Sequence, residues 1–255
     1  MGKLYVLGDS YTTPDICVDP QDSFWGLAGA ELGVDQIINA SRQINSFDTV
    51  CQLLIGMQNE YTYDWENDYF IIGIPPLERI TAFFPERVDM PIHTEKATWK
   101  DYNAKIYNTA TFESFDTVIQ AHNSLFSLQF FGGDQQLTIH ADRSWLETQV
   151  LRELYLLTNW LDSNNAKYLI CNLSKPLDDS NKWGPSDVVL NHAIGHTNCI
   201  LFDKTYYSVN VGMHIPPDAD TVPHDPYSGH HGPEGNKLYY ETSVRQKMTQ
   251  LGWIP

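Results

Sequence analysis

Residues 4–13 read LYVLGDSYTT, and this stretch fixes the starting point of the fold. An apolar run over residues 4–7 ends at Gly8 and is followed at once by Asp9 and Ser10. A short apolar run stopped by glycine is typical of a strand buried on both faces of a parallel sheet. The stretch therefore predicts a central strand whose carboxyl end carries a tight turn with an exposed hydroxyl group.

Strand-like and helix-like patterns alternate along most of the remaining chain. The helical segments repeat apolar residues every three or four positions, with Ser46 as an expected N-cap and Gly33 as an expected C-cap. Such alternation predicts an α/β fold with a mainly parallel sheet. The predicted strands are residues 34–41, 68–76, 166–174 and 199–205, and the predicted helices are residues 22–33, 46–58, 142–165 and 236–252.

Residues 80–140 break this alternation with a mixture of polar and aromatic side chains. A helix-like stretch lies around residues 115–126. We expect a single domain over residues 1–255, with a partly helical insertion at about 80–140 that covers one end of the sheet.

The formal net charge of −16 limits the classes of partner. Nucleic acids and anionic membranes are polyanions, so the charge disfavours both. No stretch approaches the roughly 20 apolar residues of a membrane-spanning helix, and the amino terminus lacks the basic and apolar regions of a signal peptide. We therefore expect a protein of the cytoplasm or of a virion that has no membrane or nucleic-acid partner.

Ser10 has the position that a nucleophile needs. It follows a strand and precedes a helix, so free backbone N–H groups lie near its hydroxyl. The loop HDPYSGHHGPEGN, just before the last helix, supplies Asp225, His230 and His231 as candidates for an acid and a base. These are the ingredients of a Ser-His-Asp set, although the chain has no GxSxG motif.

Five short blocks in order make the sequence resemble the SGNH (GDSL-like) hydrolases, and the compact bacteriophage and environmental bacterial members in particular. The blocks are VLGDSYT, WGLAGAELG, INASRQINS, IIGIPPLER and GHHGPEGN, and together they cover the whole chain. The resemblance implies a three-layer, flavodoxin-like sandwich that hydrolyses esters or similar acyl bonds without a cofactor. It also implies that Ser10 is the nucleophile.

The resemblance also assigns the base. The family pattern H-P-x-x-x-G places a glycine five positions after the catalytic histidine, which fits His230 with Gly235. His231 is the alternative. The family's aspartate stands two or three positions before this histidine, whereas the nearest acid here is Asp225, five positions before it. Asp225 is therefore the candidate orienting acid, and a Ser-His dyad is the alternative.

The oxyanion donors depart from the family pattern. Ser10 supplies one backbone N–H group, and the second-block glycine falls on Ile44 or Asn45, whose backbone N–H can still donate. The third-block asparagine falls on Pro75, which has no donor. Asn45, or Arg79 a turn further on, is a candidate replacement.

Several alternatives stand beside these roles. Asp9 could polarise the site or hydrogen-bond the turn backbone. His192 and His196 have the spacing of a metal-binding pair on a helix, but we interpret them as surface or packing histidines and expect no metal. The four cysteines share no CxxC spacing, which predicts free thiols.

The sequence thus favours a serine esterase that acts on a small-molecule or saccharide ester, with O-acetyl groups as one possible acyl part. The first alternative is a catalytically impaired protein of the same fold that binds glycans or serves as a structural module of a virion. A phosphate or nucleotide binder is disfavoured, because the first loop lacks the successive glycines and the lysine of a phosphate cradle. The sequence does not fix the oligomeric state.

Overall fold

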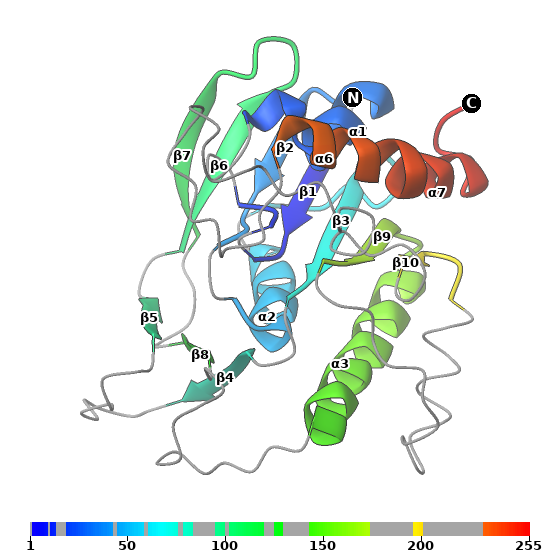
Figure 1. Ribbon diagram of the computed structural model, residues 1–255. Coiled ribbons are helices and arrows are strands. Elements are labelled where there is room, and N and C mark those ends of the chain that lie inside the picture. The colour runs from blue at the N-terminus through cyan, green and yellow to red at the C-terminus, as the bar shows by residue number, and fades with distance from the viewer. Residues whose placement is uncertain are drawn as a thin grey trace.

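A seven-stranded mixed sheet forms the centre of the protein, and helices flank it in the computed structural model (Figure 1). Three further strands form a second, smaller sheet. The structure describes residues 2–9, 11–13, 19–42, 45–58, 61–75, 104–117, 148–173, 196–200 and 232–255, and the backbone of residues 79–83, 95–99, 102–103, 118–119, 125–129 and 143–147.

The main sheet has a parallel part and an antiparallel part. Among its described strands, four pairings are parallel and two are antiparallel. The parallel strands lie in the order β2-β1-β3-β9-β10, and β6 and β7 continue the sheet beyond β2. The strands are β1 (Lys3–Leu7), β2 (Gln36–Asn39), β3 (Tyr69–Ile74), β6 (Tyr102–Asn108), β7 (Ser114–Ile119), β9 (Lys167–Asn172) and β10 (Cys199–Ile200).

Helices cover both faces of this sheet. Because successive side chains of a strand point to opposite faces, Leu4 and Val6 of β1 contact one layer of helices and Tyr5 and Leu7 contact the other. The first layer contains α1 and the carboxyl-terminal helices, and the second contains α2 and α3 (Figure 1). The helices are η1 (Pro20–Asp22), α1 (Phe24–Leu32), α2 (Phe47–Met57), α3 (Arg143–Ser163), α6 (Pro233–Tyr239), the π-helical turn η3 (Tyr240–Val244) and α7 (Arg245–Gln250).

The ends of the first two long helices follow the sequence signals. The side chain of Ser23 accepts a hydrogen bond from the backbone N–H of Gly26, and the side chain of Ser46 accepts one from Thr49. Gly33 ends α1 with a φ of 67°, in the left-handed region that glycine adopts at little cost. The expected α/β architecture and both expected caps, Ser46 and Gly33, are confirmed.

The expected partly helical insertion at 80–140 is wrong for the residues that the structure describes there. All of them within an element are strands, including β7 in the segment where a helix around 115–126 was expected. In β6, Ala104 and Ile106 point into the core and Lys105 lies between them, so the pattern has the two-residue period of a strand. The smaller antiparallel sheet consists of β4 (Arg79–Phe83), β5 (Glu95–Trp99) and β8 (Leu125–Gln129).

The carboxyl-terminal segment runs alongside α1 and is tied to it at both ends. Near the start of α1, the rings of Phe24 and Tyr239 meet edge to face with centroids 5.3 Å apart. Near its end, Glu31 accepts hydrogen bonds from the Tyr240 hydroxyl and from Arg245, whose Nη2 lies 2.8 Å from Oε1. The hydrogen bond from Arg245, more than any other contact, lowers the pKa of Glu31 below its usual value.

We predict that Glu31→Gln lowers the stability of the protein at neutral pH and that the loss shrinks as the pH falls below the unfolded-state pKa of Glu31. Because the pKa of Glu31 is lowered in the folded state, the contribution of the ion pair is present above the unfolded-state pKa. It is lost as the pH falls through the folded-state pKa. Urea denaturation at pH 7 and at pH 3 measures both parts of the prediction.

Glu241→Gln is the matched control, since Glu241 is exposed and lies 4.0 Å from Lys237 on the same segment. We expect this control to change stability little at either pH. A Glu31→Gln difference that persists or grows at pH 3 would contradict the assignment.

Candidate functional site

The carboxyl ends of four parallel strands meet at one edge of the main sheet. β1, β2, β3 and β9 are neighbours in parallel register, so the residues that follow them lie at that edge. These residues begin with Gly8, Ala40, Pro75 and Leu173. In open α/β sheets this edge is where ligands bind, most often beside the strands at which the chain changes direction across the sheet.

The turn after β1 is held by one heavily used carbonyl group. The backbone oxygen of Asp9 accepts hydrogen bonds from the N–H groups of Thr12 and Thr13, each at 3.0 Å. It also accepts from the hydroxyls of the same two residues, at 3.0 and 2.9 Å. The carboxylate of Asp9 is fully buried and its Oδ1 accepts from the N–H of Tyr11 at 3.1 Å. Asp9 therefore hydrogen-bonds the backbone of the turn, which is one of the two roles that the sequence predicted for it.

Two asparagines fasten this turn to the neighbouring strand and loop. The Nδ2 group of Asn39, at the end of β2, donates to the carbonyl of Thr12 at 2.8 Å. The Nδ2 group of Asn45 donates to the carbonyl of Gly8 at 2.8 Å. Both side chains are buried, at 1% and 0% exposed. A buried amide that holds a backbone carbonyl contributes about 1 kcal/mol net, and losing it costs more because the carbonyl stays buried.

Asn45 was also a candidate oxyanion donor, through its backbone or its side chain. Its backbone N–H faces the carbonyl of Arg42 at 3.5 Å, and its amide donates to Gly8. The side-chain amide of Asn45 is therefore used to hold the turn.

Glycine is required at the first position of the turn because of a close approach. A Cβ atom on Gly8 would lie 2.3 Å from Oγ1 of Thr12 and 3.4 Å from the Cα of Gly73 in β3. β1, its turn and β3 thus pack without room for a side chain at this point. Pro75, buried directly beyond β3, contributes no N–H donor to the edge.

A single buried side chain links the beginning of α1 with the beginning of α6. Oδ1 of Asn236 accepts from the N–H of Phe24, which is 212 residues away in sequence, and Nδ2 donates to the carbonyl of Gly232; both distances are 3.2 Å. Asn236 is 2% exposed. Gly232 directly follows His231, and α1 is the first long helix after Ser10. The segment that directly follows His231 is therefore in contact with the first turn of α1.

The other predicted site residues are placed only in part. Ser10, Ile44, Asp225, His230 and His231 lie outside the described residues. For Arg79 the structure describes the backbone, at the start of β4.

The described cysteines offer no alternative nucleophile at this edge. Cys51, Cys171 and Cys199 are free thiols, and Cys17 lies outside the described residues. Cys171 pairs with Gly73 near the carboxyl end of β9, and burial raises the pKa of its thiol to about 12. A thiol that stays protonated at neutral pH is a poor nucleophile.

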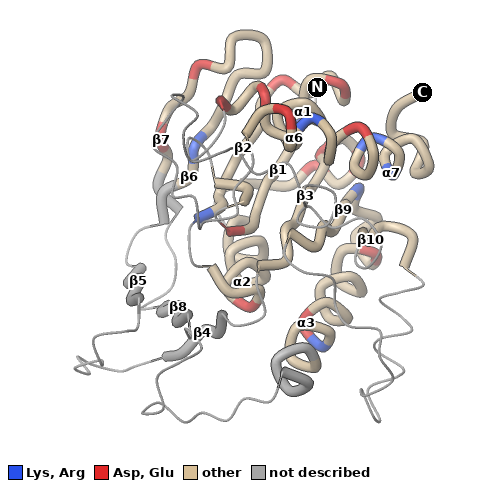
Figure 2. The backbone as a smooth tube through the Cα atoms, in the orientation of Figure 1, with Lys and Arg blue, Asp and Glu red and all other residues tan. Residues whose placement is uncertain are grey.

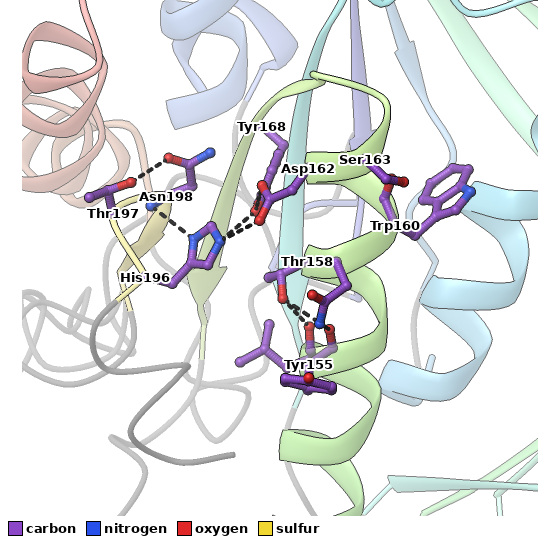
Figure 3. A network of polar contacts seen from close by, with 11 residues as sticks. Tyr155, Thr158, Trp160, Asp162, Ser163, Tyr168, His196, Thr197 and Asn198 are labelled. Atoms are coloured by element: carbon purple, nitrogen blue, oxygen red, sulfur yellow. Dashed lines mark hydrogen bonds and ion pairs between the residues drawn. The ribbon is translucent and has the colours of Figure 1, made fainter. Parts of the chain in front are cut away.

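A second polar cluster lies at the opposite, amino-terminal edge of the sheet (Figure 3). His196 Nε2 lies 3.0 Å from Oδ2 of Asp162 and 2.9 Å from the hydroxyl of Tyr168, which donates to Oδ1 of Asp162. The N–H of Asn198 donates to the other ring nitrogen of His196 at 3.3 Å. Burial, followed by the hydrogen bond to Asp162, raises the pKa of Tyr168.

Both ring nitrogens of His196 are therefore used within the protein, which confirms its interpretation as a packing histidine. His192, its proposed partner in a metal pair, lies outside the described residues. Among the side chains that the structure describes, no group of three or more His, Cys, Asp or Glu residues is arranged to hold a metal ion. Within the same part of the chain, no helix has the length and apolar character to cross a bilayer.

No known family model matches the sequence, and no curated protein matches it significantly.

We predict that Asn236→Ala lowers the free energy of unfolding by about 1–3 kcal/mol, because two buried backbone groups lose a hydrogen bond. Asn236→Asp keeps the acceptor for Phe24 but places a carboxylate oxygen against the carbonyl of Gly232, so it should be destabilising as well. Urea denaturation of the three proteins measures the difference.

Asn159→Ala is the control, since this exposed amide donates to Tyr155 within α3. We expect a change within about 0.5 kcal/mol for the control. If Asn236→Ala proves as mild as the control, the link between α1 and α6 does not stabilise the fold.

Proposed function

We propose that the protein is a serine hydrolase of the SGNH type, built on a three-layer flavodoxin-like fold, that cleaves small or saccharide esters. The order β2-β1-β3-β9-β10 supports the fold, because it is the flavodoxin-like order 2-1-3-4-5. In that order the ligand site lies beyond the ends of β1 and the strand next to it, which here is β3. Ser10 follows the end of β1 in sequence.

The observation that carries the proposal is the hydrogen-bonded link through Asn236. It joins the carbonyl of Gly232, the residue after His231, to the first turn of α1. In this chain a Ser-His mechanism requires Ser10 and His230, more than 200 positions apart, to come within proton-transfer distance. The contact between α1 and α6 supports that approach, and the rigid turn around Asp9 supports a fixed nucleophile.

In the proposed mechanism His230 removes the proton from the hydroxyl of Ser10 as Oγ attacks the ester carbonyl. The carbonyl π electrons move to oxygen, and the backbone N–H groups of Ser10 and Ile44 stabilise this oxyanion. As the tetrahedral intermediate collapses, the ester C–O bond breaks and His230 gives its proton to the departing alcohol. Water, deprotonated by His230, then releases the acyl group as a carboxylic acid and restores Ser10.

Asp225 is the proposed partner that orients His230, and His231 is the alternative base. Arg79 is retained as a candidate donor to the substrate, because Pro75 cannot supply the usual third oxyanion donor. The chemistry needs no metal or cofactor.

The negative charge of the protein favours a substrate that carries no negative charge. Asp and Glu residues occur on α1, α2, α3 and β7, and the fewer Lys and Arg residues are dispersed among them (Figure 2). A surface of this kind repels polyanions and favours a neutral ester, such as an O-acetylated saccharide. We propose a place in the cytoplasm or in a virion, without a nucleic-acid or membrane partner.

A second candidate function is glycan binding or a structural role in a virion, without catalysis. Pro75 motivates it, because losing one oxyanion donor costs about 10²–10³ in rate in a related chemistry. The experiment below separates the two candidates.

We predict that Ser10→Ala lowers the hydrolysis of p-nitrophenyl acetate by roughly 10³-fold or more, because the reaction loses its nucleophile. A fluorophosphonate should label the wild-type protein at Ser10 and should leave Ser10→Ala unlabelled. Mass spectrometry of the labelled peptide identifies the site.

Ser163→Ala is the control, since Ser163 is an exposed serine at the end of α3. This variant should hydrolyse p-nitrophenyl acetate and be labelled by the fluorophosphonate to the same extent as the wild type. Full turnover by Ser10→Ala would refute the mechanism, and a folded wild type that neither turns over nor labels would favour the non-catalytic alternative.

A further inference from the structure

The hydroxyl of Ser41 is buried and has no hydrogen-bond partner in the described part of the chain. Ser41 is 4% exposed, and its backbone N–H donates to Oδ1 of Asn39 at 2.9 Å, but Oγ makes no such contact. A buried hydroxyl that has left water without gaining a partner costs about 1–3 kcal/mol. Such groups are uncommon in native proteins, and a ligand that completes the hydrogen bond is one physical reason for keeping one.

Ser41 lies at the carboxyl edge, beside the end of β1. The residue before it, Ala40, donates its N–H to the carbonyl of Val6 at 2.9 Å. The residue after it, Arg42, donates to the carbonyl of Gly8 at 3.4 Å. The backbone of Ser41 is therefore held next to the strand end that leads into Ser10.

Asn39 connects Ser41 with the turn after β1. Ile37 packs with the α1 layer and Ile38 with the α2 layer, so alternation assigns Asn39 to the α1 layer. Asn39 reaches the carbonyl of Thr12 in the turn after β1, and the same amide side chain accepts from the N–H of Ser41. Ser41 is thus two residues after Asn39, whose side chain holds the turn.

We propose that Ser41 Oγ binds an oxygen atom of the ester substrate, either the carbonyl oxygen of the acyl group or a hydroxyl of the alcohol. The inference rests on the proposed hydrolase function and adds a substrate-binding residue to it. A serine hydroxyl both donates and accepts, so it suits either oxygen. Binding the substrate supplies the partner that the folded protein lacks at this position.

The chain contains a matched control in Ser243. Its hydroxyl is also 4% exposed and also has no partner among the described residues. Ser243 lies in η3, near the Tyr240 contact with Glu31 at the far end of α1. It is roughly 15 Å along the helix from the start of α6 at a rise of about 1.5 Å per residue, and so away from the edge that holds Ser41.

The experiment compares wild type, Ser41→Ala and Ser243→Ala in stability and in activity. Because each substitution removes an unpaired buried hydroxyl, both variants should unfold at the same urea concentration as the wild type or at a higher one. Ser41→Ala should lower kcat/KM by roughly 3- to 10-fold, the factor that one lost hydrogen bond produces. Ser243→Ala should keep the wild-type kcat/KM.

Two substrates distinguish the two possible oxygen atoms. p-Nitrophenyl acetate has an ester carbonyl but no hydroxyl group, whereas an acetylated xylose has both. If Ser41 binds the carbonyl oxygen, Ser41→Ala loses activity on both esters. If it binds a hydroxyl of the alcohol, the loss is confined to the sugar ester and falls mainly on KM.

The outcomes separate this inference from the proposed function. Wild-type kcat/KM for Ser41→Ala on both esters would overturn the inference and leave the hydrolase standing. A clear loss of stability in Ser41→Ala would overturn it too, because the hydroxyl would then have a partner. A folded wild type without esterase activity and without labelling at Ser10 would overturn the function and the inference together.

Discussion

Between β2 and β3, the side chains of β1 have no contact with solvent: Leu4, Tyr5, Val6 and Leu7 are all 0% exposed. Burying each of the three aliphatic side chains contributes about 1.5–3 kcal/mol. Their sum is comparable with the entire net stability of an ordinary domain, about 5–15 kcal/mol. A strand buried on both faces needs a helical layer on each, and this need places α1 with the carboxyl-terminal helices on one side and α2 with α3 on the other. The position of the candidate site at the carboxyl edge then follows from the parallel pairing.

Local pattern was enough to predict the parts of the fold in which burial has a regular period. The apolar run at β1 and the three-to-four-residue repeat of α3 each correspond to an element of the structure. The same method failed at β6 and β7. There the chain forms a hairpin at one side of the sheet, and the described side chains from Glu113 to Asp116 in it are exposed. With little apolar burial to enforce a pattern, the two-residue period of β7 is faint, and the mixed composition was open to a helical interpretation.

The candidate site was predictable only where a turn carries its own chemical signal. Gly8 and Asp9 predict a tight turn. The structure explains Gly8 by its close approach to Thr12, and Asp9 by the hydrogen bonds that it makes within the turn. Asn236 could not be found in this way, because its partner at Phe24 is 212 residues away and no local spacing records such a contact. Ser41 escaped notice for a related reason. A missing hydrogen bond becomes visible only when the surroundings of the hydroxyl are known.

The polar groups at the carboxyl edge of the sheet fall into two kinds. Some hydrogen-bond the backbone, and others are proposed to bind the substrate. The side-chain amides of Asn39 and Asn45 donate to the carbonyls of Thr12 and Gly8, and the carboxylate of Asp9 accepts from the N–H of Tyr11. Since Pro75 offers no donor, a developing oxyanion in the proposed reaction would lack the side-chain amide that the family pattern supplies and would depend on backbone donors and on the candidate Arg79. A site with fewer donors stabilises the transition state less and relies more on holding the substrate in place. The unpartnered hydroxyl of Ser41 is a group of the kind that such positioning requires, and its burial keeps competing water away from the bond that it would form.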